Sequence, residues 1–307
     1  MNDQSIYIIG SGAIGKALAV FLKLNNRNVV LIRGSIDDQS VQSETFQVEL
    51  SDKTILTASV EVNTLSNFKE LNGIIVLTNK SFGNAQLSQS LKGKINSSPI
   101  VVLQNGLGVE QPFIDNGFTE IYRCILFATS QTISPKALRF KPVAISPIGT
   151  IKGNGTYLNA IVELLDNPHF HFKALTDIQT IIWKKAIVNS VFNSVCPLLD
   201  VDNGIFHRNE AALAIAKRVI GECVAIANAS GISLKVEEVN ESLLMISKVS
   251  DGQLISTLQD IKNKRLTEIS TLNFSIVDIA KKLGKEARVT ETKLLGELTL
   301  LKSELNR

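Results

Sequence analysis

The sequence is poor in the residues that build disulfide frameworks and metal centres. It has only three cysteines and three histidines among 307 residues. Cys124, Cys196 and Cys223 lie far apart and form no CxxC pair. We therefore expect reduced, mostly buried thiols, as in a cytoplasmic protein. The histidines show no metal-ligand spacing, so we expect no metal site.

Long apolar runs, a basic leader and a strong charge imbalance are also missing. No apolar run approaches the length of a membrane span, and the polar start lacks the basic region of a signal peptide. The formal net charge of +3 is too small to indicate a nucleic-acid or membrane partner. The length of 307 residues allows two domains, each with its own core.

A glycine-rich turn near the start is the most informative segment present. Residues 10–15 read Gly-Ser-Gly-Ala-Ile-Gly and directly follow the apolar run 6–9. A strand, a GxGxxG turn and a helix in this order are typical of a dinucleotide site. The first glycine permits the tight turn, the second leaves room for phosphate, and the third lets the helix pack closely. The helix N-terminus then binds the pyrophosphate. We expect cofactor contacts from Gly10, Ser11, Gly12, Ala13, Ile14 and Gly15.

The end of the second predicted strand indicates which dinucleotide binds. Sites that prefer NAD usually place Asp or Glu there for the ribose hydroxyls, whereas this chain has Arg33. Because an arginine suits a 2′-phosphate, the sequence predicts NADP(H). Asp37 and Asp38 lie close by and compete as ribose ligands, so NAD stays an alternative.

The first half of the chain alternates short β-branched runs with helical stretches. This alternation predicts a mostly parallel sheet with crossover helices. The strand–turn–strand pattern between residues 127 and 149 predicts additional antiparallel strands. The expected strands are 5–9, 28–33, 46–49, 54–62, 74–78, 99–103, 121–128, 137–140, 143–148 and 170–174.

After about residue 175 the helical period takes over. Ser256–Gln259 looks like a capping box that begins a long final helix pattern. The predicted fold class is α/β, with an N-terminal Rossmann-type dinucleotide-binding domain (1–174) followed by an all-helical C-terminal domain (175–307) for substrate and catalysis. The expected helices are 177–199, 208–230, 235–248, 256–284 and one after Thr290.

A polar stripe on the first of these helices points to catalysis. Lys185, Asn189 and Asn193 are spaced i, i+4, i+8 and share one face of an otherwise apolar helix. An ordinary solvent face would carry more charge, although that interpretation stays open. If a hydride reduces a carbonyl, a lysine ammonium can protonate and stabilise the oxygen.

Further candidates follow the predicted strands and the helical segments. Lys80 and Asn105 come directly after two neighbouring strands, at the sheet edge where ligands bind. Ser256 and Glu268 lie on the predicted final helix. A helix cap for Ser256, and an exposed pair between Glu268 and Arg265, are the competing structural interpretations.

Taken in order, these motifs resemble the 2-dehydropantoate 2-reductases (ketopantoate reductases) over essentially the whole chain. The resemblance implies NADPH-dependent reduction of ketopantoate to (R)-pantoate, a step of pantothenate and coenzyme A biosynthesis. It implies Lys185 as general acid and Glu268 as a partner of the substrate hydroxyl or of another site residue. It places Lys80 and Asn105 near the cofactor. It also implies a substrate site lined by Asn105, Asn189, Asn193 and Ser256. The motifs are residues 10–15, Arg33, Lys80, 105–108, 183–193, 203–204, 256–260 and 267–269.

Two other functions stay open at this point. Residues 128–132 and 194–198 differ from the residue pattern usual in the family, so a different small 2-oxo acid stays open as substrate. A catalytically silent NADP(H)-binding sensor needs only the glycine turn and Arg33, and has no use for Lys185. A homodimer is among the oligomeric states that the sequence leaves open.

Overall fold

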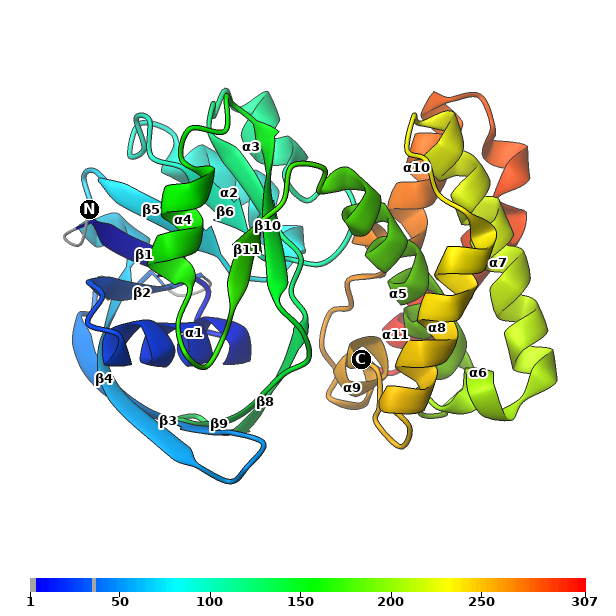
Figure 1. The fold of residues 1–307 in the computed structure, drawn as a ribbon, viewed down its shortest axis with the longest axis horizontal. Helices are drawn as coiled ribbons and strands as arrows, with labels where there is room; N and C mark the ends of the chain where they lie inside the picture. Colours follow the sequence, from blue (N-terminus) through cyan, green and yellow to red (C-terminus); the bar gives the residue numbers. More distant parts are fainter. Residues whose placement is uncertain (1–3, 35–36) are drawn as a thin grey trace. The chain divides into compact units, whose positions relative to one another are not determined.

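The computed structural model describes residues 4–34 and 37–307, which form two compact units (Figure 1). The first unit runs to Gln104 and continues over Val109–Ile178. The second comprises Asn105–Gly108 and Gln179–Arg307. The predicted fold class, a Rossmann-type α/β region followed by a helical region, is confirmed.

One mixed sheet organises the first unit. Its described strands follow the order β11-β10-β7-β6-β5-β1-β2-β4-β3-β9-β8. The central pairs β1–β2, β1–β5, β5–β6 and β6–β7 are parallel. The bounds are β1 Ser5–Ile9, β2 Val29–Arg33, β3 Gln42–Glu49, β4 Ile55–Thr64, β5 Gly73–Leu77, β6 Ile100–Val102, β7 Ile121–Cys124, β8 Ala128–Ser134, β9 Ala137–Pro142, β10 Ser146–Lys152 and β11 Phe172–Ala174.

Helices cover both faces of this sheet. Alternate residues of a strand point to opposite faces, so Ile8 and Ile9 enter different buried clusters. The cluster around Ile8 includes residues of α1 (Ala13–Leu24) and α4 (Leu158–Leu165). The cluster around Ile9 includes residues of α2 (Asn84–Leu91) and α3 (Gln111–Asp115). Because both faces are buried, the central strands are continuous apolar runs.

The predicted antiparallel addition is present, although one strand differs from expectation. β10 pairs antiparallel with β7, and β8 forms a hairpin with β9. The predicted strand 121–128 is wrong, because β7 ends at Cys124 and a separate β8 begins at Ala128. β8 is polar, mostly exposed and at the end of the sheet order. An edge strand of this kind has no apolar alternation to reveal it.

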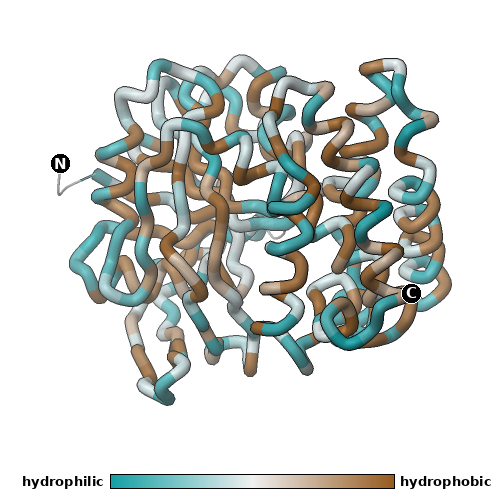
Figure 2. The backbone as a smooth tube through the Cα atoms, turned by 45° about the vertical axis from the view of Figure 1, so that its right-hand side comes forward, coloured by the Kyte–Doolittle hydropathy of each residue, from teal (hydrophilic) through white to brown (hydrophobic). Residues whose placement is uncertain are grey.

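Amphipathic helices build the second unit. Hydrophobic and hydrophilic stretches alternate along its backbone in Figure 2, as expected for helices with one buried face. α5 lies against α7, α8 and α11. The bounds are α5 Gln179–Leu199, α6 Ile205–Arg208, α7 Glu210–Ala229, α8 Val236–Val249, α9 Ser256–Lys262, α10 Asn273–Lys282 and α11 Thr290–Leu305.

The predicted single helix 256–284 is wrong. The structure has α9, a non-helical stretch, the 3₁₀ segment η3 (Ile269–Thr271) and α10. Lys264 adopts a positive φ of 56°, and the Arg265 amide donates back to the Asp260 carbonyl, which ends α9. Ser256 is the first residue of α9 rather than its cap, which is Ile255.

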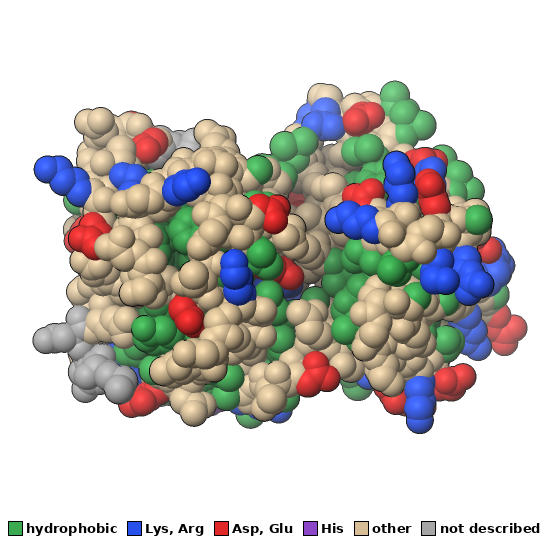
Figure 3. Space-filling view, turned by 90° about the horizontal axis from the view of Figure 1, so that it is seen from above, with side chains coloured by type: hydrophobic (Ala, Val, Ile, Leu, Met, Phe, Trp, Pro, Cys, Tyr) green, Lys and Arg blue, Asp and Glu red, His purple; other side chains and the backbone are tan. Residues whose placement is uncertain are grey.

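Charge is spread over both units. On the face drawn in Figure 3, basic and acidic side chains are intermixed on the helical unit. Among the residues that the structure describes, no helix has the length and apolarity needed to cross a bilayer.

Candidate functional site

The glycine-rich turn between β1 and α1 has the geometry of a phosphate cradle. Gly10 has a φ of +120°, and a Cβ there would lie 2.4 Å from the Asn79 backbone nitrogen. A Cβ on Gly15 would lie 2.0 Å from the Gly10 carbonyl oxygen. A Cβ on Gly12 would meet nothing within 4 Å. Two glycines therefore permit close backbone packing, while the third borders open space.

The end of β5 holds this turn in place. The Thr78 hydroxyl donates to the Gly10 carbonyl at 2.8 Å, and the Asn79 amide donates to the Ile9 carbonyl at 3.1 Å. Sequence reasoning missed Thr78, which it placed in the strand. Its position after the strand next to β1 was the available signal.

Two further observations fit an anionic dinucleotide at this turn. The N-cap of α1 is Gly12, so the helix has no side-chain cap, and its first turn holds no acidic residue. Such a helix N-terminus favours an anion through its amides and its dipole. The Asn79 Oδ1 atom is buried with no hydrogen-bond partner among the described residues. A ligand hydroxyl or amide would satisfy it.

Arg33 lies at the end of β2 and is already engaged. Its Nη2 donates to Asp38 Oδ1 at 2.9 Å and to the Ser40 carbonyl at 2.8 Å, and its side chain is only 16% exposed. The Ser40 amide, above all, lowers the pKa of Asp38. The Ser66 hydroxyl does the same for the pKa of Asp37. A 2′-phosphate at Arg33 must therefore compete with the Asp38 carboxylate.

A buried polar network fixes both ends of the 105–108 loop. Asn84 Nδ2 donates to Gln104 Oε1 at 2.6 Å and to the Val109 carbonyl at 2.7 Å. The Arg123 guanidinium is buried, pairs with Glu110 and donates to the Gln104 carbonyl at 3.2 Å. Sequence reasoning missed this network because its members lie far apart in the chain.

The middle of the same loop packs on η3 of the helical unit. Leu107 donates its amide to the Thr271 carbonyl at 2.9 Å. Gly106 has a φ of +103°, and a Cβ there would lie 2.4 Å from that carbonyl oxygen. Thr271 donates its amide and its hydroxyl, each at 3.1 Å, to the Glu268 carbonyl. Backbone contacts therefore link the loop of Asn105 to Glu268.

The polar stripe of α5 meets the start of α9. Asn193 is buried, and its Nδ2 donates to the Asn189 carbonyl at 2.9 Å. Its Oδ1 accepts from the Ser256 hydroxyl at 3.2 Å and from the Thr257 amide at 3.3 Å. Asn193 thus caps α9 from another helix and orients Ser256. Asn189 and Lys185, which lie one and two turns before Asn193 on the stripe, are half-buried.

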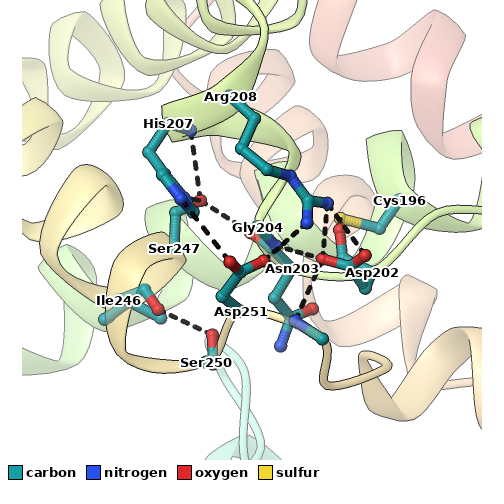
Figure 4. Close-up of polar contacts among 11 residues, drawn as sticks. Cys196, Asp202, Asn203, Gly204, His207, Arg208, Ile246, Ser247, Ser250 and Asp251 are labelled. Atoms are coloured by element: carbon teal, nitrogen blue, oxygen red, sulfur yellow. Dashed lines mark hydrogen bonds and ion pairs between the residues drawn. The ribbon is translucent and has the colours of Figure 1, made fainter.

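The Asn203-Gly204 motif belongs to a charged cluster (Figure 4). Asp202 accepts two hydrogen bonds of 2.8 Å from Arg208, which also donates to Asp251 at 2.7 Å. A Cβ on Gly204 would lie 1.9 Å from Asp251 Oδ1, so a larger residue would have to displace the Asp251 side chain. Ser247 donates to the Asn203 carbonyl at 2.7 Å. This cluster ties α6 to the end of α8.

Metal and thiol chemistry find little support in the described residues. No group of three or more His, Cys, Asp or Glu side chains there is arranged to hold a metal ion. All three cysteines are free and buried, as predicted. Burial raises the pKa of Cys196 and of Cys223 to about 12, which keeps both as thiols near neutral pH.

A mixed sheet with a parallel centre and a glycine-rich turn, followed by a helical unit, is typical of dinucleotide-binding oxidoreductases. The family model described as "Ketopantoate reductase PanE/ApbA" matches residues 6–143, and its C-terminal model matches 177–295. The chain belongs to the ketopantoate reductase family, which places it among oxidoreductases that act on CH–OH groups.

Named relatives and solved structures are similar along nearly the whole chain. The 2-dehydropantoate 2-reductase of Pyrococcus abyssi is 27% identical over 92% of this chain and 93% of its own length. D-mandelate dehydrogenase with NADH and anilino(oxo)acetate superposes with a TM-score of 0.83 at 22% identity, covering 98% of this chain and 99% of its own. A dimeric ketopantoate reductase from Staphylococcus aureus gives 0.81 at 16% identity, covering 99% and 100%.

Proposed function

We propose that this protein reduces 2-dehydropantoate to (R)-pantoate with NADPH, a step of pantothenate and coenzyme A biosynthesis. The observation that carries the proposal is the match of both family models, in order, to the two regions that hold the glycine turn and the Lys185 helix. The family supports a nicotinamide dinucleotide in general, and Arg33 is our reason for choosing NADP(H).

The residues of the first unit fit such a cofactor. The turn from Gly10 to Gly15 and the α1 N-terminus would hold the pyrophosphate, and Arg33 the 2′-phosphate. Lys80 and Asn105 would lie along the remainder of the cofactor. When bound, the reduced nicotinamide supplies the hydride for the carbonyl carbon.

The helical unit would supply the proton and the substrate contacts. We assign Lys185 as the general acid that protonates the carbonyl oxygen and stabilises its developing charge. Asn105, Asn189 and Ser256 would bind the polar groups of the substrate. Asn193 would contribute by holding Ser256, since its amide already bonds there. Glu268, tied to the 105–108 loop through Thr271, would orient the substrate hydroxyl or Lys185.

The deciding experiment is oxidation of NADPH with ketopantoate beside a panel of aliphatic and aryl 2-oxo acids. We expect turnover selective for ketopantoate. Turnover selective for another acid would overturn the substrate assignment but keep the reductase. Binding of NADPH without turnover on the whole panel would overturn the reductase and favour the sensor.

The role of Lys185 is tested with its neighbour on the same helix as control. Lys185→Ala removes the proton donor, so we expect kcat to fall by about 10²–10⁴-fold with little change in the Kd of NADPH. Lys184→Ala removes the adjacent half-buried lysine and should leave kcat within a few-fold of wild type. An equal loss in both variants, or a loss of NADPH affinity alone, would contradict the assignment.

We further propose a homodimer in the cytoplasm. The three buried free thiols suit a reducing compartment. A protein of this fold, the Staphylococcus aureus ketopantoate reductase, is dimeric.

A further inference from the structure

The stretch between α8 and α9 leads directly to Ser256. Residues 250–255 are all described by the structure and form neither helix nor strand, and Ser256 is the first residue of α9. Gly252 turns the chain with a φ of 75°, and the Gln253 amide closes the turn by donating to the Ser250 carbonyl at 3.0 Å. One such bond closes a turn but does not place it against its surroundings. The position of Ser256 therefore depends on contacts between this stretch, which we call the 250–255 turn, and other parts of the helical unit.

Backbone bonds attach the 250–255 turn to the chain that follows α5. The Asn203 amide donates to the Gln253 carbonyl at 2.9 Å. The Val201 amide in turn donates to the Cys196 carbonyl at 3.1 Å, in the last turn of α5. α5 is the helix that carries the Lys-Asn-Asn stripe. The turn that precedes Ser256 is therefore connected in two short steps to the helix that we assign to catalysis.

The Arg208 side chain joins the same two segments a second time (Figure 4). Its Nη2 donates to both carboxylate oxygens of Asp202 at 2.8 Å, and its Nη1 donates to Asp251 Oδ1 at 2.7 Å. Asp202 Oδ1 also accepts from the Gly252 amide at 3.3 Å. Because the guanidinium is planar and rigid, a bridge with a carboxylate at each end fixes both the distance and the direction between them. Arg208 thus holds the 250–255 turn at Asp251 and, through Asp202, at Gly252.

On its other side, Ser256 is held less tightly. The Ser256 hydroxyl donates to Asn193 Oδ1 at 3.2 Å, and the Thr257 amide donates to the same atom at 3.3 Å. Both contacts are long for bonds of their kind, whereas the bonds of Arg208 to its carboxylates are short and charge-assisted. The contacts of the 250–255 turn are therefore the firmer of the two restraints on Ser256.

We propose that Arg208 is a positioning residue for substrate binding, which bridges Asp202 and Asp251 and so sets where the 250–255 turn places Ser256 beside the stripe of α5. The inference rests on the proposed function, in which Ser256 binds a polar group of the substrate. The side chains of the bridge are between 25% and 44% exposed. Ion pairs exposed to this degree contribute little to global stability, so the bridge acts mainly on local geometry.

The first test separates substrate binding from the other steps. Arg208→Gln removes the bridge, so we expect the KM of the 2-oxo acid to rise about tenfold, the cost of misplacing one hydrogen bond to the substrate. We expect little change in kcat, and none in the Kd of NADPH, because the glycine turn and Arg33 belong to the first unit. Arg218→Gln is the matched control, since it removes an arginine of α7 that bonds to Glu291 at 2.7 Å. A KM that is unchanged in Arg208→Gln, or that rises equally in both variants, would overturn the proposal.

A double-mutant cycle shows whether Arg208 acts through Ser256. In a Ser256→Ala background the hydroxyl that Arg208 positions is gone, so Arg208→Gln should raise the KM little further. A general loss of stability would instead add its full effect in both backgrounds. A KM that rises about tenfold in each background would therefore overturn the proposal.

Hydrogen exchange measured by mass spectrometry tests the bridge without any turnover. We expect the amides of residues 250–257 to exchange faster in Arg208→Gln than in the wild type or in Arg218→Gln. If Arg208→Gln does not fold, Asp251→Asn weakens the link to the turn while the two bonds from Arg208 to Asp202 remain. Unchanged exchange in the folded variant would overturn the proposal. Faster exchange in a protein whose wild type turns over no 2-oxo acid would count against the proposed function, while the hold of Arg208 on the turn would stand.

Discussion

Arg33 and Asp38 form the side-chain pair on which our proposal of a preference for NADP(H) rests. The guanidinium that we assign to the 2′-phosphate is bound by the Asp38 carboxylate at 2.9 Å. In the proposed binding mode, the 2′-phosphate of NADPH would displace or share this contact, whereas NADH has no 2′-phosphate. If Arg33 binds the 2′-phosphate as proposed, the preference for NADPH over NADH would depend on how well this phosphate competes with the Asp38 carboxylate for Arg33.

Removing the competing charge is expected to strengthen NADPH binding. Asp38→Asn keeps the size of the side chain but lowers its hold on Arg33, so we expect the Kd of NADPH to fall about fivefold, the worth of one surface ion pair. The Kd of NADH should change less, and fluorescence titration measures both. Asp37→Asn is the matched control, because Asp37 bonds to Ser66 instead. Equal changes in the Kd of NADPH and of NADH would show that Arg33 does not bind the 2′-phosphate.

Most residues of the candidate site could be proposed from the sequence, but their contacts could not. The glycine turn and the stripe of Lys185, Asn189 and Asn193 are local patterns, visible in a few consecutive residues. That Asn193 bonds to Ser256, 63 residues later, is a long-range contact that no local pattern contains. The role of Asn193 as a cap therefore became apparent only in the structure.

At the scale of elements, α11 depends on a cap from another helix. Its own cap position, Val289, offers no side-chain hydrogen bond. Glu222 of α7 instead accepts from the amides of Glu291 at 3.0 Å and Thr292 at 2.8 Å. A carboxylate at this end also complements the helix dipole.

Glu222→Gln is therefore expected to destabilise the helical unit by about 1–2 kcal/mol, since it removes the charge and one acceptor from the helix start. Urea unfolding followed by circular dichroism measures the change. Glu241→Gln alters an exposed glutamate of α8 and should stay within about 0.5 kcal/mol of wild type. If both variants unfold at the same urea concentration, Glu222 does not cap α11.

Elements with strong apolar periodicity could be predicted, and the exceptions have physical reasons. The parallel strands and α5, α7, α8 and α11 lie close to their expected ranges. No proline or glycine marks the point where the predicted helix 256–284 is interrupted. The turn there is made by Lys264, a non-glycine residue with a positive φ. β8 was missed since its polar residues gain their strand conformation only by pairing with β9.

Over the whole molecule, carboxylates in both units link stability to acid pH. The Arg208 guanidinium, above all, lowers the pKa of Asp202 below its usual 3.8. A folded-state pKa below the unfolded value stabilises the protein fully above about pH 4, and this contribution is lost as pH falls through the folded pKa. The carboxylates with lowered pKa values are Asp37, Asp38, Glu49, Asp52, Asp202 and Glu286.

We expect thermal stability to decrease steeply below about pH 4. Asp202→Asn should be less stable than wild type at pH 7, and the difference should narrow as the pH falls below about 4, because the stabilisation from a lowered pKa is lost there. Melting temperatures from pH 7 to pH 3 test this, with Asp278→Asn on the exposed side of α10 as control. A gap that stays constant with pH would mean that the Asp202–Arg208 pair does not act through charge.

Residues 105–108 belong to the second unit, although the residues before and after them in the sequence belong to the first. The helical unit is therefore not one continuous stretch of the sequence. The hydrogen bond from the Leu107 amide to the Thr271 carbonyl joins its two parts. A chimaera that joins residues 1–178 of one relative to 179–307 of another would take Gly106 from one parent and Thr271 from the other. We expect the close approach of Gly106 to Thr271 to decide whether such a chimaera packs correctly at residues 105–108.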